Sequence, residues 1–118
     1  LAIITGRSSR VVEHRARNLG IDIVHQGAHD KLAVYEALCR ELGLVCEATA
    51  YMGDDVVDLP VMRRAGLAIT VPAAPDLVKA HSHYTTTREA GRGAVREACE
   101  FLMRAQGTLD AALAPYLR

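Results

Sequence analysis

The fold is decided by the stretch Tyr51-Met52-Gly53-Asp54-Asp55-Val56-Val57-Asp58. An apolar run over residues 48–52 ends at the glycine, and two adjacent carboxylates follow. A third carboxylate comes three residues later, at the start of an amphipathic segment. This pattern predicts a buried strand, a sharp turn and the beginning of a helix.

The acids of this turn have two interpretations. In open α/β sheets, ligands bind at the carboxyl ends of the strands, and the carboxylates would repel one another there unless a cation offset them. Mg²⁺ is the simplest candidate, because it prefers oxygen ligands, and this makes Asp54 and Asp55 candidate metal-binding residues. The alternative is that Asp54 and Asp55 only cap the helix, where carboxylates are also favoured. The turn alone leaves both interpretations open.

Composition limits the classes of protein to consider. The 118 residues suffice for one domain, half of them are hydrophobic, and 14 basic residues balance 14 acidic ones. Zero net charge gives no support for a nucleic-acid or membrane partner. The three cysteines are scattered, which is typical of a reducing compartment, so we expect a cytoplasmic protein.

Outward from the turn, apolar runs alternate with helical patterns. The strands are expected at residues 1–5, 21–25, 48–52, 67–71 and 83–86, and the helices at residues 8–19, 31–42, 56–65, 75–80, 94–105 and 109–117. Alternation of this kind predicts an α/β fold, a Rossmann-like parallel sheet with helices on both faces. The short loops leave no room for an inserted lid domain after any of these strands.

Polar residues follow three of the expected strands. Thr5 and Gly6 end the first, Lys31 follows the second, and the acids of the turn, including Asp58, follow the third. In a parallel sheet these ends lie at one edge, so the groups can converge. A hydroxyl, free N–H groups, an ammonium and a carboxylate-bound cation together suit a phosphoryl group, whose charge must be neutralised during transfer.

Five stretches carry a resemblance to a known family: Ile3-Ile4-Thr5-Gly6-Arg7, residues 27–31, residues 53–58, residues 91–97 and Gln106-Gly107. Together they resemble the cap-less branch of the haloacid dehalogenase superfamily, over essentially the whole chain. The branch implies a homotetrameric, Mg²⁺-dependent hydrolase that removes phosphate from an eight-carbon acidic sugar during lipopolysaccharide precursor synthesis. A nine-carbon acidic sugar phosphate fits the same residues.

The resemblance also implies roles for the residues. Asp54 would bind Mg²⁺, and Asp55 would support a metal-bound water or the loop. Thr5 and the N–H of Gly6 would hold phosphoryl oxygens, and Lys31, oriented by Asp58, would steady the phosphate. In the substrate-binding part of the site, Arg7 would meet the sugar carboxylate, for which a planar guanidinium is well suited, and Arg92 would help to build the pocket.

The chain departs from the family at its first motif. A strand ending in Asp-x-Asp-Gly, which supplies the attacking aspartate, is absent from these 118 residues. In the family that strand lies between the strands that here carry Thr5 and Asp54, so we expect an interrupted sheet and a single domain, residues 1–118, that is incomplete at its N-terminus.

Two further functions remain open at this point. A signalling receiver domain also uses acids, Thr and Lys around Mg²⁺, but there the acid pair precedes the Thr and Lys, whereas here it follows them. A non-catalytic subunit without its own nucleophile is expected if Leu1 is the start of the protein.

Overall fold

Five parallel strands form two separate sheets in the computed structural model, which describes all 118 residues. The first sheet pairs β1 (Ala2–Ile4) with β2 (Ile23–His25). The second has the order β3 (Ala50–Met52), β4 (Leu67–Thr70), β5 (Tyr84–Thr85). The predicted α/β class with parallel strands is confirmed, and the expected interruption falls between β1, which leads into Thr5, and β3, which leads into the acidic turn.

The helices follow the predicted order. They are α1 (Arg10–Asn18), α2 (Lys31–Glu41), α3 (Leu59–Met62), α4 (Asp76–Ala80), α5 (Ala94–Gln106) and α6 (Leu109–Leu113), with short 3₁₀ turns at Cys46–Ala48, Val56–Asp58 and Ala114–Tyr116. Side-chain caps begin the first two. The Ser9 hydroxyl accepts from the Val11 N–H at 3.2 Å, and the Asp30 carboxylate accepts from the Ala33 N–H at 3.1 Å. These caps satisfy N–H groups that a helix leaves unpaired at its start.

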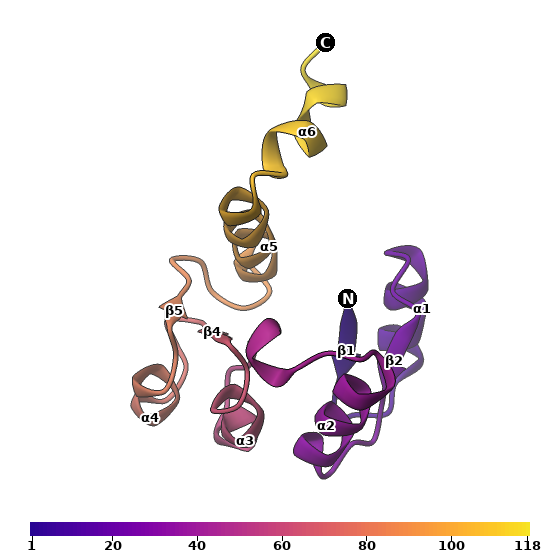
Figure 1. Cartoon of the computed structure of the whole chain (residues 1–118), viewed down its shortest axis with the longest axis vertical. Coiled ribbons are helices and arrows are strands. Elements are labelled where there is room, and N and C mark those ends of the chain that lie inside the picture. The colour runs from indigo at the N-terminus through magenta and orange to yellow at the C-terminus, as the bar shows by residue number, and fades with distance from the viewer.

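The helices lie on both sides of the second sheet (Figure 1). Helices α3 and α4 lie below its strands in this view, and α5 lies above them. Buried side chains from α3, β4, α4, α5 and the loop between β4 and α4 form one core cluster: Met62, Ala68, Val71, Ala74, Val78 and Ala94. Helix α2 packs against both β1 and α3, and it therefore connects the first sheet to the second.

A second core cluster lies where α2 meets α3. It consists of Tyr35, Cys39 and Val61, with Tyr51 of β3 packed against it. The hydroxyl of Tyr35 also lies 2.8 Å from the hydroxyl of Thr49, just before β3. The apolar packing of this cluster holds α2, and hence Lys31 at its start, in place relative to β3, and the hydrogen bond adds to its stability.

The solvent-accessible surface of the chain is large for its mass. Its accessible area is 8138 Å², against about 6,300 Å² for a compact monomer of this mass. Figure 1 shows α5 and α6 leading away from the sheets to the C-terminus, where Tyr116 and Leu117 are more than 80% exposed. None of the helices has the length and apolar character needed to cross a membrane.

Three expected elements are replaced in part by 3₁₀ turns in the structure. The strand expected at residues 48–52 begins only at Ala50, because Cys46–Ala48 is a 3₁₀ turn. The helix expected at residues 56–65 is a 3₁₀ turn followed by the short α3, since the Asp58 side chain is drawn back to the N–H groups of the acidic turn. The last helix changes to a 3₁₀ turn around Pro115, whose ring nitrogen carries no N–H to continue an α-helix.

Candidate active site

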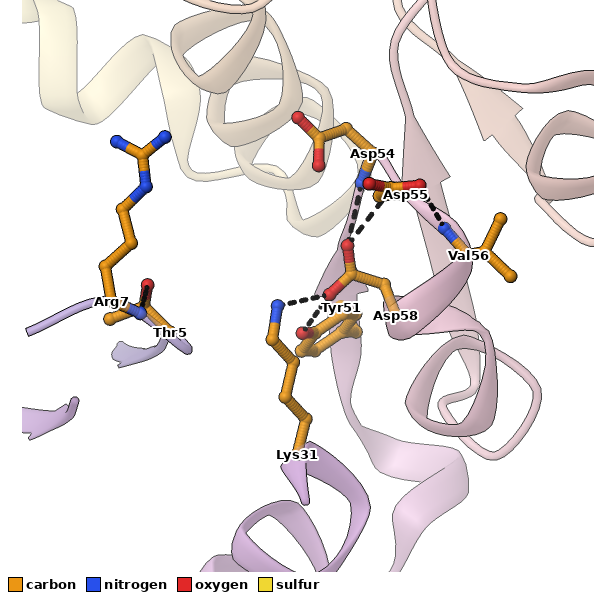
Figure 2. Close-up of polar contacts among 8 residues, drawn as sticks. All are labelled: Thr5, Arg7, Lys31, Tyr51, Asp54, Asp55, Val56 and Asp58. Atoms are coloured by element: carbon orange, nitrogen blue, oxygen red, sulfur yellow. Dashed lines mark hydrogen bonds and ion pairs between the residues drawn. The ribbon is translucent and has the colours of Figure 1, made fainter. Parts of the chain in front are cut away.

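Asp58 is the centre of the site, and four donors hold its carboxylate (Figure 2). Its Oδ1 accepts from the Lys31 ammonium at 2.8 Å and from the Tyr51 hydroxyl at 2.9 Å. Its Oδ2 accepts from the N–H groups of Asp54 at 3.0 Å and Asp55 at 3.2 Å. Only 3% of Asp58 is exposed. A carboxylate that is buried to this extent needs such partners, because desolvation of an unpaired charge is costly.

The acidic turn, residues 53–58, depends on the small size of Gly53. A Cβ added at this buried position would lie 2.5 Å from the Cβ of Asp58 and 2.9 Å from its Oδ2. Real side chains do not approach so closely, so the glycine provides the space into which the Asp58 carboxylate folds back. The requirement is one of space alone, since the φ angle of Gly53 is not positive.

Lys31 reaches the acidic turn from the other sheet. It is the first residue of α2, and backbone hydrogen bonds join the turn before it to the end of β1. There the Ala28 N–H donates to the Thr5 carbonyl at 2.9 Å, and the Gly27 N–H donates to the Arg7 carbonyl at 3.0 Å. The ends of β1 and β2 are thereby fixed together, and the Lys31 side chain spans from them to Asp58 (Figure 2).

Electrostatics keep Asp58 ionised. Burial on its own would raise the pKa of this carboxyl, but the hydrogen bonds from Lys31 and Tyr51, the charge of Lys31 and the N–H of Asp54 outweigh it and lower the pKa. Burial and then the neighbouring Asp58 charge raise the pKa of the Tyr51 phenol. Tyr51 therefore stays protonated and donates to a carboxylate.

Thr5, Gly6 and Arg7 line the end of β1. The Thr5 hydroxyl accepts from the Arg7 N–H at 3.1 Å, which closes a small turn. The Gly6 N–H has no acceptor within the chain. Figure 2 shows the exposed Arg7 side chain extending from this end of β1, across an open space from the acidic turn. A free N–H and a free guanidinium make this end of β1 a suitable place for an anion.

Asp54 and Asp55 differ in how the chain uses them. The Asp55 carboxylate accepts from the Val56 N–H at 2.7 Å and forms a capping box with Asp58, so the capping interpretation holds for Asp55. Asp54 is exposed, and its carboxylate makes no contact with the other residues drawn in Figure 2. A direct metal-binding role for Asp54 and a supporting role for Asp55 stay predictions.

Few side chains of the site are free to bind a cation. No group of three or more His, Cys, Asp or Glu side chains is placed to hold a metal ion, because Asp58 is engaged by Lys31 and Asp55 caps the 3₁₀ turn. The free Asp54 carboxylate fits an oxygen-preferring cation such as Mg²⁺, which commonly takes only one or two protein carboxylates and keeps several waters.

The loop that carries Arg92 is anchored by Glu97. The Glu97 carboxylate accepts from the Tyr84 hydroxyl at 2.7 Å and from the N–H groups of Thr87 at 2.8 Å and Arg88 at 3.0 Å. The Tyr84 hydrogen bond is the main cause that lowers the pKa of Glu97 to about 2. Arg92 itself is exposed, and its predicted contribution to the pocket stays a prediction.

Tyr51 contacts Asp58 in the site, and the sequence argument did not single it out. It lies in the strand, where an aromatic side chain is expected to be part of the core. Its signal was its place two residues before the glycine of the acidic turn, at the end of a strand where polar groups converge. The contact of Lys31 with Asp58 was predicted as a pair in the site, and the structure contains it.

Comparisons with known proteins agree with this geometry. A sequence model of the haloacid dehalogenase-like hydrolase family matches residues 14–98. The chain is 45% identical over 112 residues to 3-deoxy-D-manno-octulosonate 8-phosphate phosphatase KdsC of Yersinia pestis and of Escherichia coli K12, covering 95% of this chain and 60% of each relative. It therefore spans three fifths of the length of these curated relatives.

Solved structures are similar over nearly the whole chain. A probable YrbI family phosphatase from Pseudomonas syringae superposes with a TM-score of 0.96 at 49% identity, covering 99% of this chain and 66% of that one. The second is 3-deoxy-D-manno-octulosonate 8-phosphate phosphatase from Moraxella catarrhalis in complex with magnesium ion, phosphate ion and KDO molecule. Its TM-score is 0.95 at 46% identity, covering 98% of this chain and 67% of that one. The chain belongs to the haloacid dehalogenase-like hydrolases.

Proposed function

We propose that this chain is the phosphate- and metal-binding part of a Mg²⁺-dependent phosphatase that hydrolyses 3-deoxy-D-manno-octulosonate 8-phosphate, a step in lipopolysaccharide precursor synthesis. The Lys31–Asp58 pair is the observation that carries the proposal, because its ammonium lies between the end of β1 and the free Asp54 carboxylate (Figure 2). The relative solved with magnesium, phosphate and KDO supports the same ligands here.

In this mechanism the residues of the chain bind and orient the substrate. Thr5 and the Gly6 N–H would hold phosphoryl oxygens, and the Lys31 ammonium would neutralise charge that develops on them during transfer. Asp54 would be a ligand of Mg²⁺, which supplies further charge neutralisation when it is bound. Arg7 would hold the sugar carboxylate and Arg92 would help to build the pocket.

The function is tested by phosphate release from the complete natural protein. We expect release from the eight-carbon sugar acid 8-phosphate in the presence of Mg²⁺, and loss of release when a chelator removes the metal. Faster hydrolysis of a nine-carbon sugar acid 9-phosphate would favour the alternative substrate. Absence of any phosphatase activity with Mg²⁺ would favour the non-catalytic role.

Asp54→Asn tests the metal site. Because Asp54 would be a direct ligand, we expect the substitution to weaken Mg²⁺ binding at least about tenfold, measured by calorimetric titration of Mg²⁺ in the complete protein. The exposed Asp22, directly before β2, is a matched control, since Asp22→Asn removes the same charge away from the acidic turn. An unchanged Mg²⁺ affinity in Asp54→Asn would remove Asp54 from the metal site.

Arg7→Ala tests the substrate class. If the guanidinium binds the sugar carboxylate, KM for the acidic sugar phosphate should rise by about ten- to a hundredfold, since a charge-assisted bidentate contact is lost. The phosphate ester p-nitrophenyl phosphate has no carboxylate, and its kcat/KM should change little. Equal losses on both substrates would instead assign Arg7 to general phosphate binding.

We further propose that the working protein is a cytoplasmic homotetramer. The exposed Tyr116 and Leu117 at the end of the chain support a contact with another subunit, since exposed clustered apolar side chains mark interaction surfaces. Such a contact would also help to close the site to bulk water. Analytical ultracentrifugation of the complete protein at micromolar concentration tests this assembly, and a monomer would exclude it.

A further inference from the structure

The Asp58 carboxylate has two oxygens, and each is shared by two donors. Oδ2 is held by backbone N–H groups of the acidic turn, whose positions the turn itself fixes. Oδ1 is shared between Lys31, which the proposed function gives to the phosphoryl group, and the Tyr51 hydroxyl, to which that function gives no role. Tyr51 is thus the one side chain that holds Asp58 without itself facing the substrate.

The Tyr51 ring is fixed on several sides. It lies in β3, which pairs with β4 through the register Tyr51 opposite Ala68. The ring packs against both core clusters, and its edge meets the ring of Tyr35 with a centroid distance of 6.5 Å and an interplanar angle of 74°. A side chain held by a strand and by two clusters gives its hydroxyl a defined position.

The hydroxyl matters because Lys31 is long and flexible. An ammonium on four methylenes loses considerable rotamer freedom when it is held at one point, so its position depends on how firmly its acceptor is held. With Tyr51 in place, Asp58 Oδ1 has a second donor and cannot follow Lys31 toward an incoming anion. The Tyr51 hydroxyl also offsets part of the negative charge on Oδ1. Asp58 therefore compensates the positive charge of Lys31 less completely, and that charge can act on the substrate.

We propose that Tyr51 is a positioning residue for phosphoryl transfer, which sets the place of the Lys31 ammonium through the shared Asp58 oxygen. The inference rests on the proposed function for the substrate, but the hydrogen-bond relay from Tyr51 through Asp58 to Lys31 is independent of it. The contact between the hydroxyl and the carboxylate carries the proposal, since a Phe ring would fill the same apolar space without it.

Tyr51→Phe in the complete natural protein tests the kinetic part. We expect kcat for the sugar phosphate to fall about tenfold, the scale of one hydrogen bond to a charged group, with KM changed by less than about twofold. Tyr35→Phe is the matched control. Tyr35 is a neighbouring buried tyrosine whose hydroxyl pairs with Thr49 and the Cys46 carbonyl, so its loss should reduce stability and leave kcat unchanged.

The side-chain ammonium signal of Lys31 tests the relay without turnover. In protein labelled with ¹⁵N-lysine, this signal is assigned by its loss in Lys31→Met, and the chain contains only one other lysine, Lys79, as an internal reference. We expect Tyr51→Phe to shift or broaden the Lys31 signal and to leave the Lys79 signal in place. Tyr35→Phe should leave both signals unchanged.

The two measurements separate the possible outcomes. Changes in kcat and in the Lys31 signal that occur in Tyr51→Phe alone support the proposal. An unchanged Lys31 signal overturns it, and so do an unchanged kcat in an active enzyme and equal effects of the two Phe substitutions. If the natural protein hydrolyses no sugar phosphate and only Tyr51→Phe alters the Lys31 signal, the proposed function fails and the relay stands.

Discussion

Lys31→Met is expected to reduce kcat for the sugar phosphate by at least about a hundredfold, since a group that neutralises developing transition-state charge is removed. The methionine keeps most of the length and the apolar stem of the lysine. It leaves the Asp58 carboxylate with its three other donors, so the fold is retained. We therefore expect a kinetic loss much larger than the loss of stability, measured by steady-state kinetics and by thermal unfolding of the same preparation.

A matched substitution tests whether the loss of kcat is caused by removing a charge from the site or by removing any lysine charge from the chain. Lys79 is the other lysine of the chain, and its ammonium donates to the Pro72 carbonyl at 2.8 Å. Lys79→Met removes an equal charge from α4 and should leave kcat near the wild-type value. A Lys31→Met protein that turns over at the normal rate with saturating substrate would exclude Lys31 from the chemistry.

Gly53→Ala is expected to cost both activity and stability. The new methyl would lie 2.5 Å from the Asp58 Cβ, so the carboxylate must leave its place below the acidic turn. Overpacking of this kind destabilises by about 1–3 kcal/mol. Displacement of Asp58 also releases Lys31, so kcat should fall by at least about tenfold, a loss to be measured together with the unfolding midpoint.

Gly66→Ala separates the two effects of the Gly53 substitution. Gly66 lies directly before β4 and not beside Asp58. A Cβ at this position would clash with the Glu47 carbonyl. Gly66→Ala should therefore lower stability while the folded fraction keeps its kcat. If Gly53→Ala retains normal kcat per folded molecule, the close approach between Gly53 and Asp58 has no role in the site.

The succession of strands and helices along the chain, most helix starts and the polar strand ends could be predicted because each depends on local sequence. The apolar run before Gly53 and the two acids after it are signals within a few residues of the strand and the turn that they define. The 3₁₀ turn at Val56–Asp58 could not be predicted, because it depends on the Asp58 side chain folding back to the N–H groups of residues 54 and 55. Helical periodicity contains no information about that competition.

The different roles of Asp54 and Asp55 also could not be predicted from the sequence. Adjacent Asp54 and Asp55 have the same chemistry, and only the backbone path decides which one caps and which one stays free. The role of Tyr51 was hidden for a similar reason, since an aromatic residue in a strand is expected to pack. Its hydroxyl gained a partner only because α3 and the start of α2 bring Asp58 and Lys31 to the same place.

The division of the strands between two sheets has a consequence for internal motion. Each sheet is held by pairing between strands that are consecutive along the chain, whereas the joint between the sheets consists of α2 with its contacts to β1 and α3. A small rotation about that joint would break no strand pairing, yet it would change the distance that the Lys31 side chain has to span. Within these 118 residues the joint thus depends on side-chain packing and not on strand pairing, and ligands that bind to Lys31 and Asp54 together would reduce the amplitude of such a rotation.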